Sequence, residues 1–354
     1  LEEAIESKVF PGAQFSISKD GKNLFNGGLG TFTYEKDSQL INNNSIYDVA
    51  SLTKVLVTTP LVMKLVEQNK LSLDQKVVQF YPQFKGNGKE NITITNLLTH
   101  SSGIPGYYKF FLDERLSSKE DIINYILNIN LNSSPGEKYE YSDLGFILLT
   151  AIIEKVSGYP IDRLAHQFIF DPVGMENTRY LPPIGWKNKI VPTEIDLQYR
   201  GRLIHGEVHD ENAFLMGGVS GHAGIFTNSI DISYYSQMLL NKGTWNGKRF
   251  FNEKLINYFT SLQNIPKGSD MALGWDTPSK SGKGNAGKYF SVGSYGHLGF
   301  TGTSLWIDPN ENIIIVLLTN RVHPSRNQDE KSIKISTVRK EFYDAVMEEL
   351  ISIN

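Results

Sequence analysis

The apolar positions between residues 52 and 66 repeat with the spacing of one face of a helix. This i, i+3, i+4, i+7 pattern predicts a helix with one buried side. Asp48 precedes the helix and can accept hydrogen bonds from its first free amides. Pro60 lies inside the pattern, and we expect it to kink the helix without ending it, because the spacing continues beyond it. The apolar or small residues that follow the pattern are Leu52, Val55, Leu56, Thr59, Val62, Met63 and Val66.

Strand patterns gather at the two ends of the chain. Residues 12–18 alternate, Asp20-Gly21 is a hairpin turn signal, and residues 23–28 return as a second strand. Near the other end, the sequence predicts a short strand at 272–275, an alternating strand at 300–307, and an apolar run at 313–319 that suits a central strand.

Helical patterns dominate the middle of the chain. The expected fold class is therefore α/β (α+β), with one antiparallel sheet built from both chain ends, flanked by helices, and a mostly helical lobe from the middle. We expect a single catalytic domain over residues 1–354, with an α/β lobe (about 1–60 and 265–354), a helical lobe (about 61–264) and the site in the crevice between them. The predicted helices cover 71–81 and 95–99 as short pieces, 118–127, 144–156, 159–170, 229–240 and, at the end, 332–350.

Composition narrows the class of protein. The 354 residues are 40% hydrophobic and 21% charged with a net charge of −3, so nucleic acid or an anionic membrane is not an expected partner. The chain has no cysteine, which excludes disulfides, thiolate catalysis and cysteine zinc sites. No apolar run approaches the roughly 18 residues of a membrane span. Since the chain starts at Leu1 with no leader, we expect a processed form or a piece of something longer, periplasmic or extracellular rather than cytoplasmic.

Three short motifs carry candidate chemistry. The first is Ser51-x-x-Lys54, which places a hydroxyl at a helix N-terminus with an ammonium one turn away. Such a tetrapeptide arises by chance roughly once or twice in a chain of this length, so it needs partners. The second is Tyr141-Ser142-Asp143, just before an apolar helix. A lysine beside Tyr141 would lower its pKa and let it act as a base, whereas an isolated tyrosine here is more often a packed one.

The third motif is Tyr295 to Gly302, which opens a strand late in the chain. Its glycines would let a substrate approach the strand edge. His297 would point into a cleft as a hydrogen-bond donor or as a cation, and the amide of Phe300 could join that of Ser51 to hold an oxyanion. The alternative is that His297 has a purely structural role. This is the role that we expect for His100.

Taken in this order, the three motifs resemble the serine β-lactamase and penicillin-binding-protein superfamily, in particular its class C-like branch of esterases, D-aminopeptidases and muropeptide amidases. Segments 97–103, 139–146, 217–226 and 317–321 add to the resemblance, which covers essentially the whole chain. The resemblance implies a β-lactamase-like fold. The roles that it implies are nucleophile for Ser51, activating amine for Lys54, general base for Tyr141, pocket wall for His297 and Gly299, and oxyanion amide for Phe300.

Two residues depart from the family pattern. Asp143 stands where the second motif usually has asparagine, and a carboxylate accepts hydrogen bonds where an amide could donate. His297 stands where many members have lysine, and a neutral imidazole attracts a substrate carboxylate less than an ammonium does. Both changes weaken the interpretation as an antibiotic-hydrolysing enzyme and favour an ester or amide hydrolase.

A polar segment from residue 200 to residue 212 resembles the corresponding segment of muropeptide amidases, which work beside N-acetylglucosaminidases. We predict that it lines the substrate pocket, while the alternative is a solvated, salt-bridged loop. A metal site formed with His222 is a further alternative, but the spacing matches no H-E-x-x-H motif, so we expect no metal and no cofactor. The candidate substrate-loop residues are Arg202, His209, Asp210, Glu211 and Asn212.

The sequence thus predicts a serine hydrolase that forms an acyl-enzyme from an ester or amide. Its partner would be a small-molecule or cell-wall-derived substrate, with a fused or neighbouring glycosidase domain as a further expectation. The specific alternative is an amidase or peptidase acting on peptidoglycan fragments. A true β-lactamase and a non-catalytic binding module are the weaker alternatives.

Overall fold

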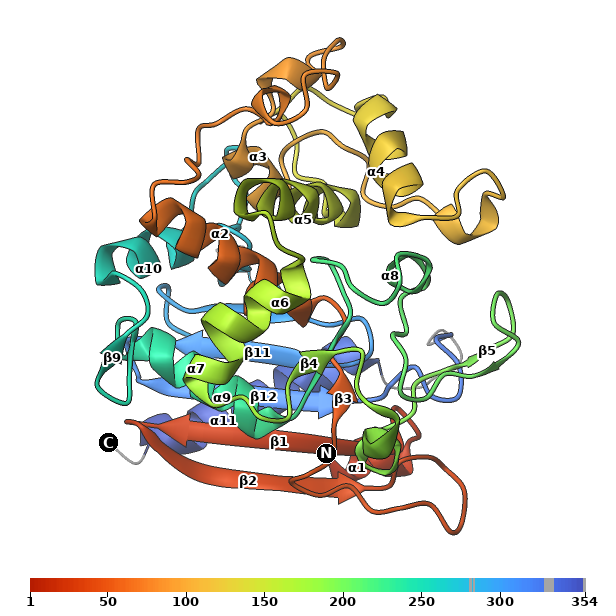
Figure 1. Ribbon diagram of the computed structural model, residues 1–354. Coiled ribbons are helices and arrows are strands. Elements are labelled where there is room, and N and C mark those ends of the chain that lie inside the picture. The colour runs from red at the N-terminus through yellow and green to blue at the C-terminus, as the bar shows by residue number, and fades with distance from the viewer. Residues whose placement is uncertain (280–281, 283, 328–333, 353–354) are drawn as a thin grey trace.

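One five-stranded antiparallel sheet joins the two ends of the chain in the computed structural model, which describes residues 1–279, 282, 284–327 and 334–352 (Figure 1). The N-terminal hairpin pairs directly with the last strand, so β12 is central as its apolar run predicts. The fold class predicted from the sequence is confirmed. In spatial order the strands are β10 (Tyr295–Leu298), β11 (Ser304–Asp308), β12 (Ile313–Thr319), β1 (Gly12–Lys19) and β2 (Lys22–Gly30).

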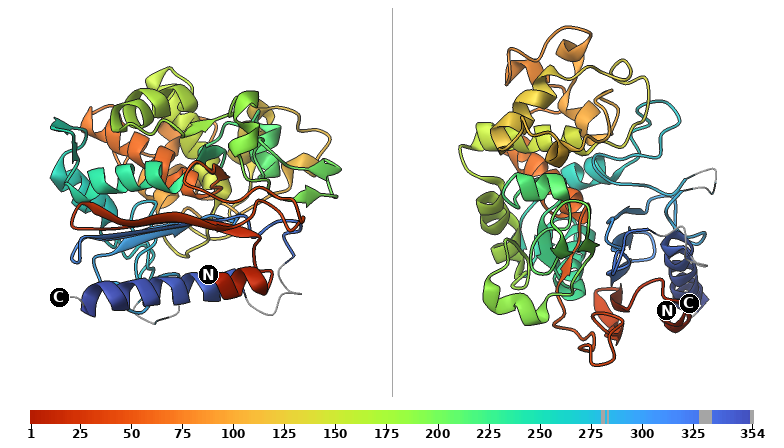
Figure 2. Two further views of the ribbon diagram at one scale, coloured as in Figure 1. Left: turned by 90° about the horizontal axis from the view of Figure 1, so that it is seen from below. Right: turned by 90° about the vertical axis from the view of Figure 1, so that its right-hand side faces the viewer.

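Helices cover both faces of this sheet (Figure 2, left). On one face lies α11 (Ile335–Ser352), whose Tyr343 and Met347 pack against Ile17 and Ile315. The other face is covered by α9 (Ser229–Leu240), which contacts β1 and β12. Because β12 is covered on both sides, all seven of its residues are buried, and the strand reads as a continuous apolar run.

The helical lobe lies at the top of Figure 1 and is built around α5 (Asp143–Ser157). Every residue of α5 from Leu144 to Ile153 is buried, and Ser142 caps its start by accepting a hydrogen bond from the Gly145 amide. Ser118 caps α4 in the same way, as predicted. Packed around α5 are α3 (Ile94–Leu98), α4 (Lys119–Asn128), α2 (Thr59–Glu67) and α6 (Ile161–Ala165).

Shorter elements connect the two lobes. A three-stranded sheet consists of β3 (Tyr47–Asp48), β7 (Ile225–Thr227) and β4 (Arg179–Tyr180), and two small hairpins pair β5 (Ile195–Asp196) with β6 (Arg202–Leu203) and β8 (Thr244–Trp245) with β9 (Lys248–Arg249). The other short helices are α1 (Glu2–Glu6), α7 (Asp171–Val173), α8 (Glu211–Leu215), α10 (Glu253–Thr260), the π-helical turn η5 (His166–Phe170) and the 3-10 turns η2 (Val77–Gln79), η3 (Lys89–Asn91), η4 (Phe110–Leu112) and η6 (Ile184–Lys189).

The predicted helix after Ser51 forms and continues through Pro60. It runs from Leu52 through the π-helical turn η1 (Lys54–Thr58) into α2. Pro60 lacks the N–H that an α-helical ladder needs, and the wider π turn lies immediately before it. Within that turn the carbonyl of Val55 accepts a hydrogen bond from the Tyr235 hydroxyl at 2.9 Å.

Three element predictions are wrong in part. Residues 272–275 form a turn rather than a strand, closed by the Ala272 amide on the Trp275 carbonyl at 2.9 Å. The strand expected at 300–307 starts only at Ser304, because a tight turn closed by the Gly299 amide on Thr303 precedes it. Between residues 71 and 81 only the short turn η2 is helical. Residues 332 and 333 of the predicted closing helix lie outside the described residues.

No single helix in the described part of the chain is long and apolar enough to cross a bilayer. One pair of helices, residues 143–157 and 161–173, is long and apolar enough when taken together, by length and composition alone, but is bent by 76°.

Two adjacent glycines of β2 test how tightly the sheet edge is packed. A Cβ on Gly28 would lie 2.8 Å from the backbone carbon of Ile41, whereas on Gly27 the nearest atom is Phe15 Cζ at 3.4 Å. We expect Gly28→Ala to lower the free energy of unfolding by about 1–3 kcal/mol. The matched control Gly27→Ala should change it by less than about 1 kcal/mol. Urea unfolding measures both, and equal stabilities would contradict the packing described.

Candidate active site

Three segments that are remote in the sequence meet at one cavity of about 790 Å3. It lies where the start of the η1 helix, the start of α5 and the edge strand β10 approach one another. Each of the three sequence motifs contributes to the wall. The motif residues that line the cavity are Ser51, Tyr141, Asp143, His297, Leu298, Gly299 and Phe300.

Asp48 fixes the turn that presents Ser51. Its Oδ1 accepts a hydrogen bond from the Ala50 amide at 2.8 Å, and its Oδ2 accepts one from the His209 amide at 2.6 Å. Ala50 has φ +45°, a left-handed conformation that a residue with a side chain rarely adopts. The prediction that Asp48 caps the first amides of the helix is therefore wrong, because one carboxylate oxygen binds the Ala50 amide and the other binds the His209 amide.

Lys54 is fully buried, and its ammonium makes three hydrogen bonds. Its Nζ donates to Ser51 Oγ at 3.0 Å, to Asp143 Oδ1 at 2.6 Å and to the carbonyl of His222 at 3.1 Å. An ammonium has three donors, so all of them are used. The Asp143 carboxylate compensates the buried charge, which would otherwise be costly.

Tyr141 lies against both residues of the first motif. Its hydroxyl is hydrogen-bonded to Ser51, and its ring centroid lies 4.8 Å from Lys54 Nζ. The ring of His100 packs on Tyr141 with a centroid distance of 4.5 Å, and His100 Nδ1 accepts the Ser142 amide at 3.0 Å. His100 is thus held by the structure around it, as the sequence predicts.

The prediction that Lys54 lowers the pKa of Tyr141 is wrong. Burial raises the pKa of this phenol well above its ordinary value, and the nearby Asp143 carboxylate raises it further, whereas the hydrogen bond with Ser51 opposes the change. The physical reason is that burial has the largest effect, while the charge of Asp143 offsets that of Lys54. Tyr141 is consequently a neutral phenol at neutral pH.

The imidazole of His297 on β10 is neutral, and its Nε2 is an acceptor rather than a donor. Its Nδ1 lies 2.7 Å from the carbonyl oxygen of Leu298, which can only accept, so Nδ1 carries the ring proton. Burial and the charge of Lys54 lower the pKa of His297 to about 3, so the ring is neutral at neutral pH. Nε2 therefore presents a lone pair, and our expectation of a donor or cation is wrong.

The turn after β10 is bound to the strand before Ser51. Thr301 Oγ1 donates to the carbonyl of Asp48 at 2.7 Å, and Thr303 Oγ1 donates to that of Val49 at 3.1 Å. A Cβ on Gly299 would overlap the Thr303 hydroxyl and the Val49 carbonyl, so only glycine fits there. These contacts hold Phe300 in the cavity wall, on a turn that is tied to the segment before Ser51.

A family model described as Beta-lactamase matches residues 1–337. The chain belongs to the beta-lactamase family. It is 35% identical over 347 residues to a Bacillus subtilis (strain 168) protein named N-acetylmuramyl-L-alanine amidase, an alignment that covers 89% of this chain and 78% of that protein. An Escherichia coli (strain K12) protein named "Putative D-alanyl-D-alanine carboxypeptidase" is 33% identical over 350 residues, covering 89% and 79%. This beta-lactamase-family chain is accordingly a serine hydrolase.

Solved structures of other proteins have the same fold. An octameric penicillin-binding protein homologue from Pyrococcus abyssi superposes with a TM-score of 0.75 at 24% identity, covering 98% of this chain and 76% of that one. EstCE1, a hydrolase with promiscuous acyltransferase activity, has a TM-score of 0.76 at 18% identity, covering 98% and 96%. At these identities the likeness supports the fold alone.

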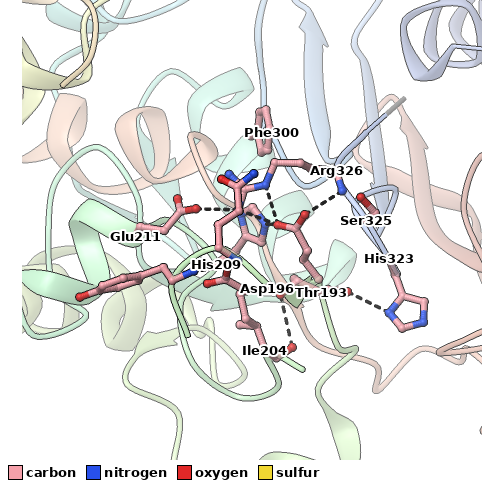
Figure 3. A network of polar contacts seen from close by, with 12 residues as sticks. Thr193, Asp196, Ile204, His209, Glu211, Phe300, His323, Ser325 and Arg326 are labelled. Carbon is pink, nitrogen blue, oxygen red and sulfur yellow. Dashed lines mark hydrogen bonds and ion pairs between the residues drawn. The ribbon is translucent and has the colours of Figure 1, made fainter. Parts of the chain in front are cut away.

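A second polar network contributes Arg326, His209 and Glu211 to the cavity wall in this beta-lactamase-family protein (Figure 3). Arg326 lies between two carboxylates, with Nε 2.6 Å from Glu194 Oε2 and a terminal nitrogen 2.6 Å from Glu211 Oε1. His209 Nε2 lies 2.9 Å from the same Glu194 oxygen, and its ring stacks on Phe300 at 5.7 Å. Burial raises the pKa of Glu194, but hydrogen bonds from His209 and Arg326 outweigh it and lower the pKa to about 2.

The polar segment from residue 200 to residue 212 divides into two parts. His209, Asp210 and Glu211 line the cavity. Arg202 is exposed, pairs with Glu207 and does not line it. Asn212 is fully buried and joins α8 to the segment at 108–110, since its amide donates to the Tyr108 carbonyl at 2.8 Å.

The two histidines considered for a metal site bind different partners. His209 pairs with Glu194, while His222 Nε2 lies 2.9 Å from Asp210 and its Nδ1 lies 2.8 Å from Ser220 Oγ. Across the described residues, no group of three or more His, Cys, Asp or Glu side chains is placed to hold a metal ion.

Sequence reasoning missed several residues of the wall. Asp276 lines the cavity beside His297, because its backbone pairs in both directions with Gly296 at 2.9 Å. Glu194, Arg326 and Arg339 also belong to the wall or support it. None of them lies in a motif, and only the tertiary pairing of distant loops brings them together, so no local signal could have found them.

Burial raises the pKa of Asp276 to about 6. An unfolded aspartate has a pKa near 3.9, so the folded protein binds more protons between these values and loses stability as pH rises from about 4 to about 6. Asp276→Asn removes the ionisation. We expect it to gain up to about 3 kcal/mol over the wild type well above pH 6 and little near pH 4. Urea unfolding at pH 4, 5 and 7 measures this, and a pH-independent difference would contradict it.

Proposed function

We propose that this serine hydrolase cleaves the amide bond between the lactyl carbonyl of an N-acetylmuramyl group and the L-alanine that follows it in peptidoglycan fragments. The observation that carries the proposal is the hydroxyl, ammonium and phenol of Ser51, Lys54 and Tyr141 in contact at one cavity. The cavity of about 790 Å3 is large enough for a sugar with part of a peptide. The Bacillus subtilis relative carries the name of this amidase activity.

In the proposed first step Ser51 Oγ attacks the lactyl carbonyl. The proton of Ser51 passes to the Tyr141 oxygen while the Tyr141 proton passes to the leaving nitrogen, so the phenol begins and ends neutral. The C–N bond breaks, and L-alanine leaves as a neutral amine. Lys54 stabilises the negative charge that develops on Oγ, and the amides of Ser51 and Phe300 are the proposed oxyanion donors.

In the second step water attacks the resulting ester. The water proton passes through Tyr141 to Ser51 Oγ, the C–O bond of the acyl-enzyme breaks, and the muramyl acid leaves. The Ser51 and Tyr141 pair gives one proton to the leaving amine in the first step and regains one from water in the second. No cofactor is needed, and the fixed ammonium of Lys54 remains paired with Asp143 throughout.

A second candidate is D-alanyl-D-alanine carboxypeptidase activity, because the Escherichia coli relative carries that name at 33% identity. Its substrate differs in one decisive way, since a free carboxylate follows the scissile bond. With either substrate we expect the protein in the periplasm or outside the cell. A fused or neighbouring β-N-acetylglucosaminidase would release the muramyl fragment that the amidase needs.

Replacement of the nucleophile tests the mechanism. Ser51→Ala should reduce release of L-alanine from N-acetylmuramyl-L-alanine by at least about 10³-fold, because the acyl-enzyme cannot form. Chromatography of the two products measures the rate. A fluorophosphonate probe should label the wild type and not the variant. Ser72→Ala, an exposed serine away from the cavity, is the control and should keep full activity. Unchanged turnover in Ser51→Ala, or no labelling of the folded wild type, would overturn the proposal.

A direct comparison of substrates decides between the two candidates. We expect kcat/KM for N-acetylmuramyl-L-alanine to exceed that for an N-acyl-D-alanyl-D-alanine peptide by at least about tenfold, because the ammonium beside Ser51 is already paired with Asp143 and does not bind a terminal carboxylate. Faster release of D-alanine would favour the carboxypeptidase. Rapid nitrocefin hydrolysis would instead indicate a β-lactamase.

A further inference from the structure

His297 Nε2 is an unsatisfied acceptor in the wall of the cavity. The residue is 2% exposed, and Nε2 has no hydrogen-bond partner among the described residues. The Leu298 carbonyl holds the ring proton on Nδ1, so Nε2 can accept a hydrogen bond but cannot donate one. A buried acceptor without a partner is costly unless a ligand supplies the donor.

Asp143 adds a second acceptor to the same wall. Its Oδ1 binds Lys54 at 2.6 Å, and the side chain stays 18% exposed and lines the cavity. The carboxylate is near enough to His297 to act on it electrostatically. The surroundings of Ser51 therefore present the acceptor oxygens of a carboxylate paired with Lys54, and a lone pair, at the two positions where the family pattern has a donating amide and an ammonium.

The arginines that line the cavity already bind other groups of the protein. Arg326 binds two carboxylates, Arg321 Nε donates to the carbonyl of Phe300 at 2.7 Å, and Arg339 donates to the carbonyls of the same turn at 2.8 and 2.7 Å. Close to Ser51 the fixed cation is Lys54, which already makes three hydrogen bonds. A substrate carboxylate beside the scissile bond would therefore meet the Lys54–Asp143 pair, in which the ammonium is already neutralised, and not a free ammonium.

We propose that His297 Nε2 and the Asp143 carboxylate are specificity-determining acceptors, which bind the N–H of a scissile secondary amide and disfavour a carboxylate next to the scissile bond. The inference rests on hydrolysis by Ser51 and sharpens its substrate class. A secondary amide such as muramyl-L-alanine offers this N–H. A β-lactam does not, because its ring nitrogen carries no hydrogen and the adjacent carbon bears a carboxylate.

The test compares the p-nitroanilide and the p-nitrophenyl ester of 2-methoxypropionic acid, which share an acyl group and differ in the N–H. His297→Lys replaces the lone pair by an ammonium, whereas His297→Gln keeps an acceptor oxygen and is the matched control. We expect the ratio of kcat/KM for the anilide to that for the ester to fall about tenfold in the lysine variant and to stay within about threefold of the wild type in the glutamine variant. A ratio unchanged in the lysine variant, or lowered equally in both variants, would overturn the proposal.

The proposed discrimination against a substrate carboxylate is tested with a double variant that combines Asp143→Asn with His297→Lys. The rate at which a fluorescent penicillin acylates Ser51, divided by the rate for an uncharged fluorophosphonate, should rise at least about tenfold over the wild type. If this ratio does not rise, the proposed discrimination against a carboxylate is overturned. These probes contain no muramyl group, so the acceptor roles can stand even if muramyl-L-alanine is not cleaved. Conversely, if muramyl-L-alanine is cleaved but the anilide-to-ester ratio does not change in His297→Lys, only the acceptor roles are refuted.

Discussion

The ion pair between Lys54 and Asp143 is the interaction on which the site depends. The ammonium is fully buried, and its contact with Asp143 Oδ1 at 2.6 Å is what makes that burial tolerable. The same contact joins the helix that begins after Ser51 to the helix that begins at residue 143, so it also closes the helical lobe onto the nucleophile. Burial keeps Tyr141 a neutral phenol, and the Asp143 carboxylate adds to this effect by raising the pKa of Tyr141 further.

A second constraint is the junction at Asp48. Its carboxylate binds the amides of Ala50 and His209, and its backbone carbonyl accepts the hydroxyl of Thr301. One residue thereby sets the turn before the nucleophile, the start of the cavity-lining loop and the turn after β10. A strained backbone at Ala50 is held in place by these contacts, which is how functional sites commonly store strain.

Two parts of the cavity wall differ in their electrostatics. Arg326 is paired with Glu194 and Glu211, so its positive charge holds two loops together. Asp143 and neutral His297 instead leave acceptors around Ser51. This arrangement suits a substrate rich in N–H and O–H donors, and it fits poorly with one recognised through a carboxylate.

The sequence by itself determined the strands at both chain ends, the buried helices and the three motifs, because each depends on local periodicity or on a short spacing. It could not determine the protonation of Tyr141 and His297. Burial is the largest cause for both residues. The charge of Asp143, 89 positions away from Lys54 along the chain, adds to it at Tyr141, and the charge of Lys54 adds to it at His297. Nor could it separate His209 and Glu211, which line the cavity, from Arg202 and Asn212, which do not. Only the tertiary structure decided these points, since charge compensation and solvent exclusion are properties of residues brought together from distant segments.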